Sequence, residues 1–364
     1  MVSIEAVRAS NARLKNTQPG LVALFVGATS GIGEYTLKQF YRQTASPVVY
    51  FVGRNQSAAT RILSELEPLN PTGTATFLRA DITLLSSVRT LCASLLTRSQ
   101  TLNLLFLTPG TFSLKAYSPT PESLDRKLAA NYYARLYFVR LLLPLLRATA
   151  AAGGLARVVS VLAAGREGEM DFADLELRRG FSLGKAMRHA VGMTGFAFEE
   201  LAGEAENAGV GFVHAFPGWV RTGFARDEGV LVRAAVRVVG AVMAWKFIGA
   251  DESGERHLWV ATSGAFPGRV GGEGEGEGKV GKGEEEVQVA RGSDGVVGSG
   301  AYLVGEAGQV VGNEKGLKGL RARGAGPKIW THTLEVFERV ERGWETDAKA
   351  AEERANATSG LSSS

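Results

Sequence analysis

The chain has 364 residues, of which 45% are hydrophobic, 21% charged and 8% aromatic. This length and composition are typical of a folded globular protein, and they exclude a disulfide-stapled mini-protein, a disordered chain and an integral membrane protein. The net charge of +4 comes without a block of lysines and arginines. Nucleic acid is therefore not expected as a partner.

Cysteine and histidine are too sparse to build a metal site or a disulfide framework. Cys92 is the single cysteine of the sequence, and the four histidines are scattered. No metal is expected, and the cysteine usage favours a reducing, cytoplasmic location. The N-terminal residues lack the apolar core of a secretory signal, and the later apolar runs are shorter than the roughly 20 residues of a membrane span. We therefore expect neither export nor a membrane span.

From residue 21 onward, short apolar runs alternate with longer helical patterns. The predicted strands lie at residues 21–26, 48–53, 74–80, 102–107, 156–162 and 210–216. Helical patterns follow them, among them long ones at residues 121–150 and 183–207. Strands joined by crossover helices form parallel sheets, and runs that are apolar at nearly every position indicate burial on both faces. The sequence therefore predicts an α/β fold with a doubly wound parallel sheet of the Rossmann type, in a single domain.

Composition predicts the boundaries along the chain. Of the 46 glycines, 20 fall between residues 264 and 326, and a stretch with little to bury is expected to be a flexible loop. The predicted parts are an N-terminal extension at residues 1–20, the main domain with substrate-binding helices at 21–263, a flexible Gly/Glu-rich insertion at 264–300, a last strand and C-terminal helix at 301–350, and a disordered tail at 351–364. We expect fraying to begin after Asp347.

The first predicted strand runs into the loop Gly27-Ala-Thr-Ser-Gly31-Ile-Gly33, which opens a helix. Gly27 permits a tight turn, Gly31 lets the backbone approach a pyrophosphate, and Gly33 allows the helix to pack closely on the strand. The helix N-terminus adds N–H donors and positive potential. Because the strand and the helix flank the loop as this site requires, a dinucleotide-phosphate site is favoured over an ordinary glycine-rich turn.

Residues after the second and third strands indicate which dinucleotide binds. Folds selective for NAD place an acidic residue about twenty positions past the loop, whereas this chain has Arg54, which suits the extra phosphate of NADP. The alternative for Arg54 is a surface arginine at a strand end. Asp81, at the end of the third strand, is placed to face the adenine, or to cap the helix that begins at Thr83 or Leu84.

Together these motifs resemble the short-chain dehydrogenase/reductase family over residues 21–224. The residues around the motifs are similar to a fungal branch of the family found in secondary-metabolite pathways. The segment beginning at Pro217 resembles the family's Pro-Gly-x-Val-x-Thr, whose backbone and threonine hold the nicotinamide amide. The resemblance implies NADP(H) as cofactor. The residues expected to bind it are Gly27, Thr29, Ser30, Gly31, Ile32, Gly33, Arg54, Asp81, Ile82, Asn131, Lys185, Pro217, Gly218, Val220 and Thr222.

The resemblance also implies a catalytic set with one member missing. In the family, a serine at the end of the fifth strand holds the substrate oxygen, the tyrosine of Tyr-x-x-x-Lys passes the proton, and an asparagine completes a proton relay. Ser160, Lys185 and Asn131 match by position, but the tyrosine position holds Phe181, which has no proton to give. The substitutes left open are Ser182, His189, Tyr132, Tyr133 and a bound water.

Three functional hypotheses follow. The first is an NADP(H)-dependent oxidoreductase acting on a hydrophobic alcohol or ketone, which the apolar residues 230–250 would bind. The second is a catalytically degraded dinucleotide-binding scaffold or sensor. The third is a structural subunit, with a possible homodimer formed through the long helices that begin near Pro121 and Phe181, since the family buries these helices in its dimers.

Overall fold

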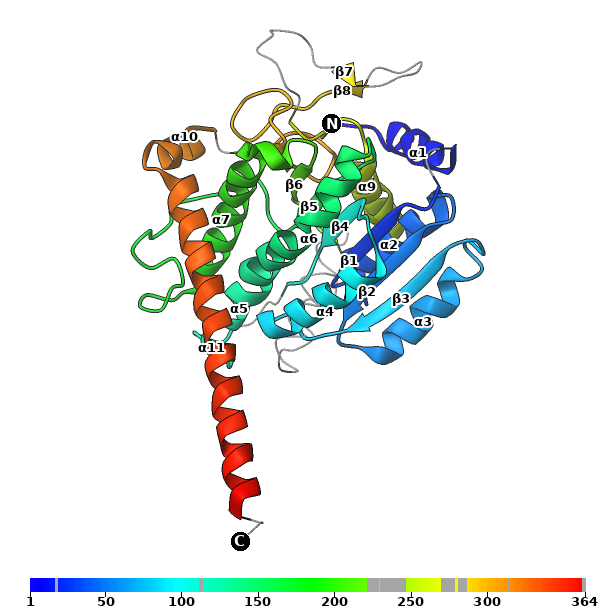
Figure 1. Ribbon diagram of the computed structural model, residues 1–364. Helices are drawn as coiled ribbons and strands as arrows, with labels where there is room; N and C mark the ends of the chain where they lie inside the picture. The colour runs from blue at the N-terminus through cyan, green and yellow to red at the C-terminus, as the bar shows by residue number, and fades with distance from the viewer. Residues whose placement is uncertain are drawn as a thin grey trace.

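One twisted sheet of parallel strands runs through the centre of the protein, with helices on both of its faces (Figure 1). The structure is a computed structural model that describes residues 1–16, 19–110, 114–220, 229, 247–269, 279–280, 287–312 and 314–361. Within that part of the chain the sheet has seven strands in the order β3-β2-β1-β4-β5-β6-β9. They are β1 (Val22–Val26), β2 (Val48–Gly53), β3 (Thr74–Arg79), β4 (Leu104–Leu107), β5 (Arg157–Val161), β6 (Gly211–Ala215) and β9 (Ala301–Val304). The predicted doubly wound α/β fold is confirmed.

Each face of the sheet has its own hydrophobic core. In β1, Ala23 and Phe25 belong to one core, whereas Leu24 and Val26 belong to the other, because successive side chains of a strand point to opposite faces. The first core is completed by α1 (Ile4–Ala12), α2 (Gly31–Gln43), α3 (Gln56–Leu66) and α9 (Ala250–Thr262). The second is completed by α4 (Leu85–Arg98), α6 (Ala134–Ala151), α7 (Leu183–Gly203) and α11 (Ala325–Leu361). Burial on both sides explains why the strands are apolar at almost every position.

The strand order reverses between β1 and β4. From β1 the chain adds β2 and β3 on one side, and then crosses over to add β4, β5, β6 and β9 on the other. At such a switch point the loops after adjacent strands diverge and leave a crevice at the carboxyl edge of the sheet. The glycine loop after β1 therefore opens into this crevice.

The helix predicted over residues 121–150 begins later and is irregular. Residues 119–125 form a turn in which Ser123 has a φ of 60°, and the carboxylate of Asp125 caps α5 (Arg126–Leu128). A π-helical turn (Ala129–Tyr133) then leads into α6. The helix predicted to end at residue 207 ends as α7 at Gly203, and a short 3₁₀ turn (Ala205–Asn207) follows.

Both ends of the described chain are helical. α1 packs on α9, where the side-chain amide of Asn11 donates to the carbonyl of Glu255. After α10 (Glu314–Ala322), α11 continues past Asp347 to Leu361, so the expected fraying and the tail that was expected to be disordered from residue 351 differ from the structure. In Figure 1, this helix crosses α7 and extends beyond the body.

The insertion predicted at residues 264–300 is partly folded. Phe266 and Val289 are buried against the body, and the described part also holds a small antiparallel pair, β7 (Lys279–Val280) and β8 (Val287–Gln288). Most of the Gly/Glu-rich centre lies outside the described residues. None of the described helices combines the length and the apolarity that crossing a lipid bilayer requires.

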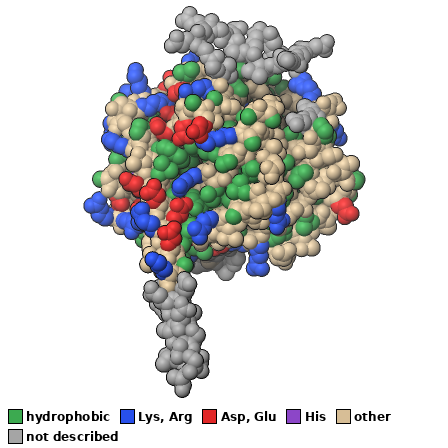
Figure 2. Space-filling model, viewed as in Figure 1, with side chains coloured by type: hydrophobic (Ala, Val, Ile, Leu, Met, Phe, Trp, Pro, Cys, Tyr) green, Lys and Arg blue, Asp and Glu red, His purple; other side chains and the backbone are tan. Residues whose placement is uncertain are grey.

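α11 covers helices that precede it by about two hundred residues. The ring of Phe337 is buried against Tyr137 of α6 at a centroid distance of 4.9 Å, and Arg339 forms an ion pair with Glu176 at 2.7 Å. Figure 2 shows acidic and basic side chains gathered over α7 and α11 on this side of the molecule. α11 thus has an apolar face turned to the body and a charged face turned to solvent.

We expect Phe337→Ala to lower the free energy of unfolding by about 3–5 kcal/mol, because it leaves a cavity between α6 and α11. Urea denaturation followed by circular dichroism measures the change. Glu335→Ala, at an exposed position of the same helix, is the control and should change stability by less than about 0.5 kcal/mol. An equal effect of the two substitutions would contradict the packing described.

Candidate active site

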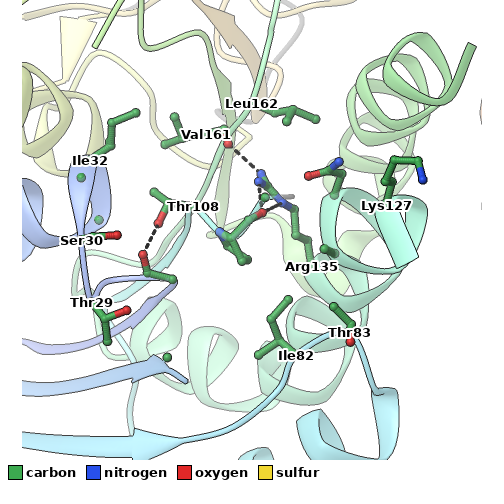
Figure 3. Close-up of a pocket in the computed structure, with 18 of the residues that line it drawn as sticks. Thr29, Ser30, Ile32, Ile82, Thr83, Thr108, Lys127, Arg135, Val161 and Leu162 are labelled. Carbon is green, nitrogen blue, oxygen red and sulfur yellow. Dashed lines mark hydrogen bonds between the residues drawn. The ribbon is translucent and has the colours of Figure 1, made fainter. Parts of the chain in front are cut away.

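A cleft of about 1060 Å³ lies at the carboxyl edge of the sheet, over the switch point. It is lined from the loops after β1, β2, β3, β4, β5 and β6. In Figure 3, Thr29, Ser30 and Ile32 stand on one side of the cleft, and Lys127 and Arg135 on the other. The residues expected from the sequence that line it are Gly27, Thr29, Ser30, Gly31, Ile32, Gly33, Arg54, Asp81, Ile82, Asn131, Pro217 and Gly218.

The glycine loop has the backbone geometry that its sequence requires. Gly27 has a φ of +83° and Gly31 a φ of +61°, which is the left-handed region that glycine tolerates best. A Cβ on Gly33 would lie 2.8 Å from the carbonyl oxygen of Gly27. α2 begins at Gly31, and no side chain of its N-cap residue, Ser30, caps it. The first turn of α2 therefore faces the cleft with its backbone N–H groups, an arrangement that suits a phosphate.

Arg54 and Asp81 lie at the same end of the cleft. Arg54 is exposed in the turn between β2 and α3. The carboxylate of Asp81 accepts hydrogen bonds from the backbone N–H of Thr83 at 3.0 Å and from its hydroxyl at 2.8 Å. The alternative role of Asp81 as the cap of α4 is wrong, because the carboxylate of Glu122 accepts from the first two N–H groups of that helix, at 2.6 and 2.9 Å.

Asn131 lines the cleft from the π-helical turn. Its side-chain oxygen lies 3.1 Å from the position that a Cβ on Gly110 would occupy, so the loop after β4 passes close to the amide. Single π-helical turns inside α-helices are frequent at functional sites, because the extra residue redirects a side chain. Asn131 therefore lines the cleft, and its role in a proton relay stays a prediction.

Ser160 does not reach the cleft. Its side chain is 0% exposed, and its hydroxyl accepts a hydrogen bond from Nη1 of Arg135 at 2.8 Å. The cleft wall after β5 is formed instead by Val161, Leu162 and Ala163, none of which carries a hydroxyl. The expectation that Ser160 holds the substrate oxygen therefore differs from the arrangement observed.

Arg135 is the site residue that the sequence analysis missed. Its guanidinium is almost completely buried (1% exposed), yet it lines the cleft. It donates to the carbonyl oxygens of Val161 at 2.8 Å and of Pro109, as the dashed lines in Figure 3 show. Burial lowers the pKa of Arg135 to about 9, so the group stays protonated at neutral pH. An arginine one helical turn after Asn131, within an apolar helix, was the signal available in the sequence.

Phe181 and Lys185 flank the cleft rather than line it. The ring of Phe181 packs against Tyr117 at a centroid distance of 6.0 Å, and Nζ of Lys127 lies over the same ring, 4.7 Å from its centroid. That amine donates to the carbonyl of Ala116 at 3.0 Å. Lys185 is half-buried in the first turn of α7, where its backbone N–H donates to the hydroxyl of Ser182. The lining contributed by α7 comes from Met187.

The side chains considered as substitutes for the missing tyrosine have structural contacts. Tyr132 and Tyr133 are buried, and their hydroxyls pair with Thr333 at 2.6 Å and His332 at 2.9 Å of α11; burial raises the pKa of both phenols. The Nε2 atom of His189 accepts from the backbone N–H of Asp171. The hydroxyl of Ser182 accepts from the backbone N–H of Lys185. Since none of these four side chains lines the cleft, a bound water remains as the substitute.

The remaining expected residues lie beyond the cleft or beyond the described chain. Val220 forms a parallel bridge with Ile248 and is not among the lining residues. Thr222 and most of the apolar segment at residues 230–250 lie outside the described residues. Among the described residues, no three His, Cys, Asp or Glu side chains gather as metal ligands would.

Comparison with known proteins gives matches at two levels. Residues 21–172 match the family described as short chain dehydrogenase. Oxidoreductase AN1596 from Emericella nidulans is 38% identical, covering 93% of this chain and 99% of its own, and oxidoreductase andH from Emericella variicolor is 37% identical, covering 93% and 98%. A structure of NADPH-bound carbonyl reductase from chicken fatty liver shares the fold, with a TM-score of 0.54 and 16% identity over 81% of this chain and 100% of the other.

Substitution of Ser160 distinguishes a structural role from a catalytic one. We expect Ser160→Ala to lower the free energy of unfolding by about 1–3 kcal/mol, because Arg135 loses an acceptor for a buried charged donor. Binding of NADPH, followed by fluorescence titration, should be unchanged within about twofold. Ser64→Ala, whose exposed hydroxyl bonds within α3, is the control for stability. A loss of binding without a loss of stability would place Ser160 back in the site.

Proposed function

Because this chain belongs to the short-chain dehydrogenase/reductase family of oxidoreductases, we propose that it transfers a hydride between NADP(H) and a hydrophobic alcohol or ketone. The observation that carries the proposal is that a single cleft collects the glycine loop, Arg54 and the Pro217-Gly218 segment. These features suit, in order, a pyrophosphate, an adenosine phosphate and a nicotinamide. A place in secondary metabolism and in the cytoplasm belongs to the same proposal.

NADP is favoured over NAD by the charges at the adenosine end of the cleft. The turn after β2 provides Arg54 and Asn55 but no carboxylate to accept from the ribose hydroxyls. A guanidinium suits a phosphate monoester because its N–H groups can bond two phosphate oxygens at once. Asp81 is the one carboxylate among the lining residues of the described chain, and it belongs to the next strand along the sheet.

An apolar substrate is favoured by the opposite end of the cleft. Met187 and Trp219 are exposed there, at 38% and 48%, and Leu162 and Phe216 also line it. Exposed apolar side chains that rim a cleft mark a surface that binds apolar ligands. The ring of Trp219 packs on Phe247 at a centroid distance of 6.3 Å, which limits its movement at the mouth.

The chain's own residues would position the reactants more than they would transfer protons. NADPH supplies the hydride when it is bound. Asn131 can hold a water at the wall of the cleft, and this water would deliver the proton to the substrate oxygen. General acid catalysis by a side chain contributes about 10² to 10⁴-fold, so an enzyme with phenylalanine at position 181 is slowed without losing hydride transfer.

The second candidate function is a dinucleotide-binding scaffold or sensor without turnover. It is favoured by Phe181 and by the absence of a hydroxyl among Val161, Leu162 and Ala163 in the cleft wall. A homodimer formed through α6 and α7 stays a prediction. The packing of α11 on these helices leaves less of their surface for a second copy.

The role of Arg54 is tested by titrating the protein with NADPH and NADH. We expect the wild type to bind NADPH more tightly, and Arg54→Ala to weaken NADPH binding by about 10- to 100-fold with little effect on NADH, because only NADPH carries the extra phosphate. Arg98→Ala, at the far end of α4, is the control. Equal affinities for both nucleotides in the wild type would contradict NADP selectivity.

Turnover is tested by restoring the missing hydroxyl groups. We expect Phe181→Tyr to raise the rate of NADPH oxidation over a panel of apolar carbonyl compounds, and Phe181→Tyr combined with Ala163→Ser to raise it further, up to about 10² to 10⁴-fold. Phe181→Leu is the control that adds no acid. Tight NADPH binding with turnover only in the tyrosine variants would favour the scaffold or sensor. No binding of either nucleotide would overturn both candidate functions.

A further inference from the structure

We propose that the buried charge of Arg135 makes the cleft bind the reduced nicotinamide cofactor more tightly than the oxidised one, so that the cleft holds NADPH when both forms are present. This inference rests on the proposed function and goes beyond it, because it assigns which redox form of the cofactor the cleft prefers and the residue responsible. It follows from where Arg135 lies, from what surrounds its charge, and from the charge that the cofactor gains on oxidation.

Arg135 lies in the half of the cleft that a nicotinamide would occupy. Dinucleotides bind across the switch point, with one nucleotide on each side of it. Arg54, which suits the adenosine phosphate, follows β2 on one side. The guanidinium of Arg135 lies on the other side, where it joins the carbonyls of Pro109 and Val161 after β4 and at the end of β5.

The charge of Arg135 is not balanced by a nearby carboxylate. Among the described residues, no Asp or Glu oxygen lies within 4 Å of its guanidinium. Its acceptors are the hydroxyl of Ser160 and backbone carbonyls, all of them neutral. Neutral acceptors satisfy the donors of a cation but leave its net charge in place.

The other cations of the cleft are exposed or paired. Lys127 is buried, but its amine lies 3.6 Å from the carboxylate of Asp125. The remaining lysines and arginines that line the cleft are exposed to solvent, where water and salt screen them; they are Arg54, Lys115, Arg126 and Arg166. Arg135 thus combines burial with an unbalanced charge. Salt and water weaken its electric field less than they weaken the field of the exposed cations.

Oxidation of the cofactor adds positive charge to the ring. In the reductive direction the hydride leaves the dihydronicotinamide ring and adds to the carbonyl carbon, while a proton from water goes to the oxygen. The carbonyl compound is reduced to an alcohol, and the neutral ring becomes a cationic pyridinium. Like charges within roughly 10 Å, at an effective dielectric constant of about 20, repel strongly enough to change affinity about tenfold. The cleft therefore holds NADPH and promotes the release of NADP⁺.

The test compares dissociation constants of NADPH and NADP⁺ by tryptophan fluorescence, without any substrate. Both nucleotides carry the same phosphates, so the ratio of their dissociation constants reports on the interactions of the nicotinamide ring. We expect the wild type to favour NADPH by about tenfold or more. Arg135→Gln, which keeps N–H donors but removes the charge, should bring the ratio to within about threefold of unity, whereas Arg135→Lys should keep the preference. Arg166→Gln removes an exposed cation as the control and should change the ratio less than twofold.

A second measurement decides the matter if Arg135→Gln fails to fold, as circular dichroism would show. The wild-type ratio is measured at 0.05 M and 0.5 M salt. A preference that persists at high salt supports a buried charge, and one that disappears assigns it to exposed cations and overturns the inference. Equal affinities in the wild type, or an unchanged ratio in folded Arg135→Gln, also overturn it. Failure of the wild type to bind either nucleotide would contradict the proposed function instead.

Discussion

The carboxyl edge of the sheet depends on the buried guanidinium of Arg135. Beyond the ends of β4 and β5 the regular ladder stops, and carbonyl groups there need donors from elsewhere. The Arg135 side chain reaches up from α6 and supplies them to Pro109 and Val161, and it also engages the hydroxyl of Ser160. The Arg135 side chain thereby joins the two loops that form the floor of the cleft. The same contacts explain why Ser160 faces away from the cleft: its hydroxyl is an acceptor for a charge that has no carboxylate partner.

The π-helical turn in the wall of the cleft is bonded to α11, a helix about two hundred residues later in the chain. Tyr132 and Tyr133 follow Asn131 directly in the π-helical turn, and their hydroxyls bond to α11. Glu122 accepts from the first turn of α4 and also from the indole N–H of Trp344. The turn at residues 119–125, which precedes α5 and the π-helical turn, is therefore bound both to α4 and to α11. A bulge that points one amide into a cleft is stable when the neighbouring side chains are anchored, and α11 provides that anchoring.

Most of the fold could be predicted because its pattern is local. Strands covered on both faces are apolar at nearly every position, and the glycine loop requires backbone angles and close contacts that a side chain would prevent, as Gly27 and Gly33 illustrate. The candidate site was less predictable where the outcome depends on distant partners. Alternation along a strand does not say which face Ser160 takes, since that choice follows from the register of β5 between its neighbours. Likewise, the capping of α4 by Glu122 joins segments 37 residues apart, and no local signal at Asp81 distinguishes a cap from a lining residue. The packing of the first part of α11, up to Trp344, depends on contacts with distant segments of the chain that no local pattern shows.

Loss of the tyrosine and retention of a buried cation have a common electrostatic consequence. In the family pattern, a lysine near the tyrosine makes a phenol a useful acid at neutral pH; with Phe181 there is no acid for a cation to tune. Positive potential in a cleft shielded from water still acts on the reaction, because it favours negative charge developing on the substrate oxygen and disfavours positive charge developing on the cofactor ring. The first effect lowers the barrier in both directions of the reaction, whereas the second stabilises the reduced cofactor relative to the oxidised one. A fixed charge such as that of Arg135 has this influence without giving up a proton, so it is compatible with a site in which water is the acid. On the inference drawn above, the preference for the reduced cofactor is then set by the floor of the cleft, independently of the group that donates the proton.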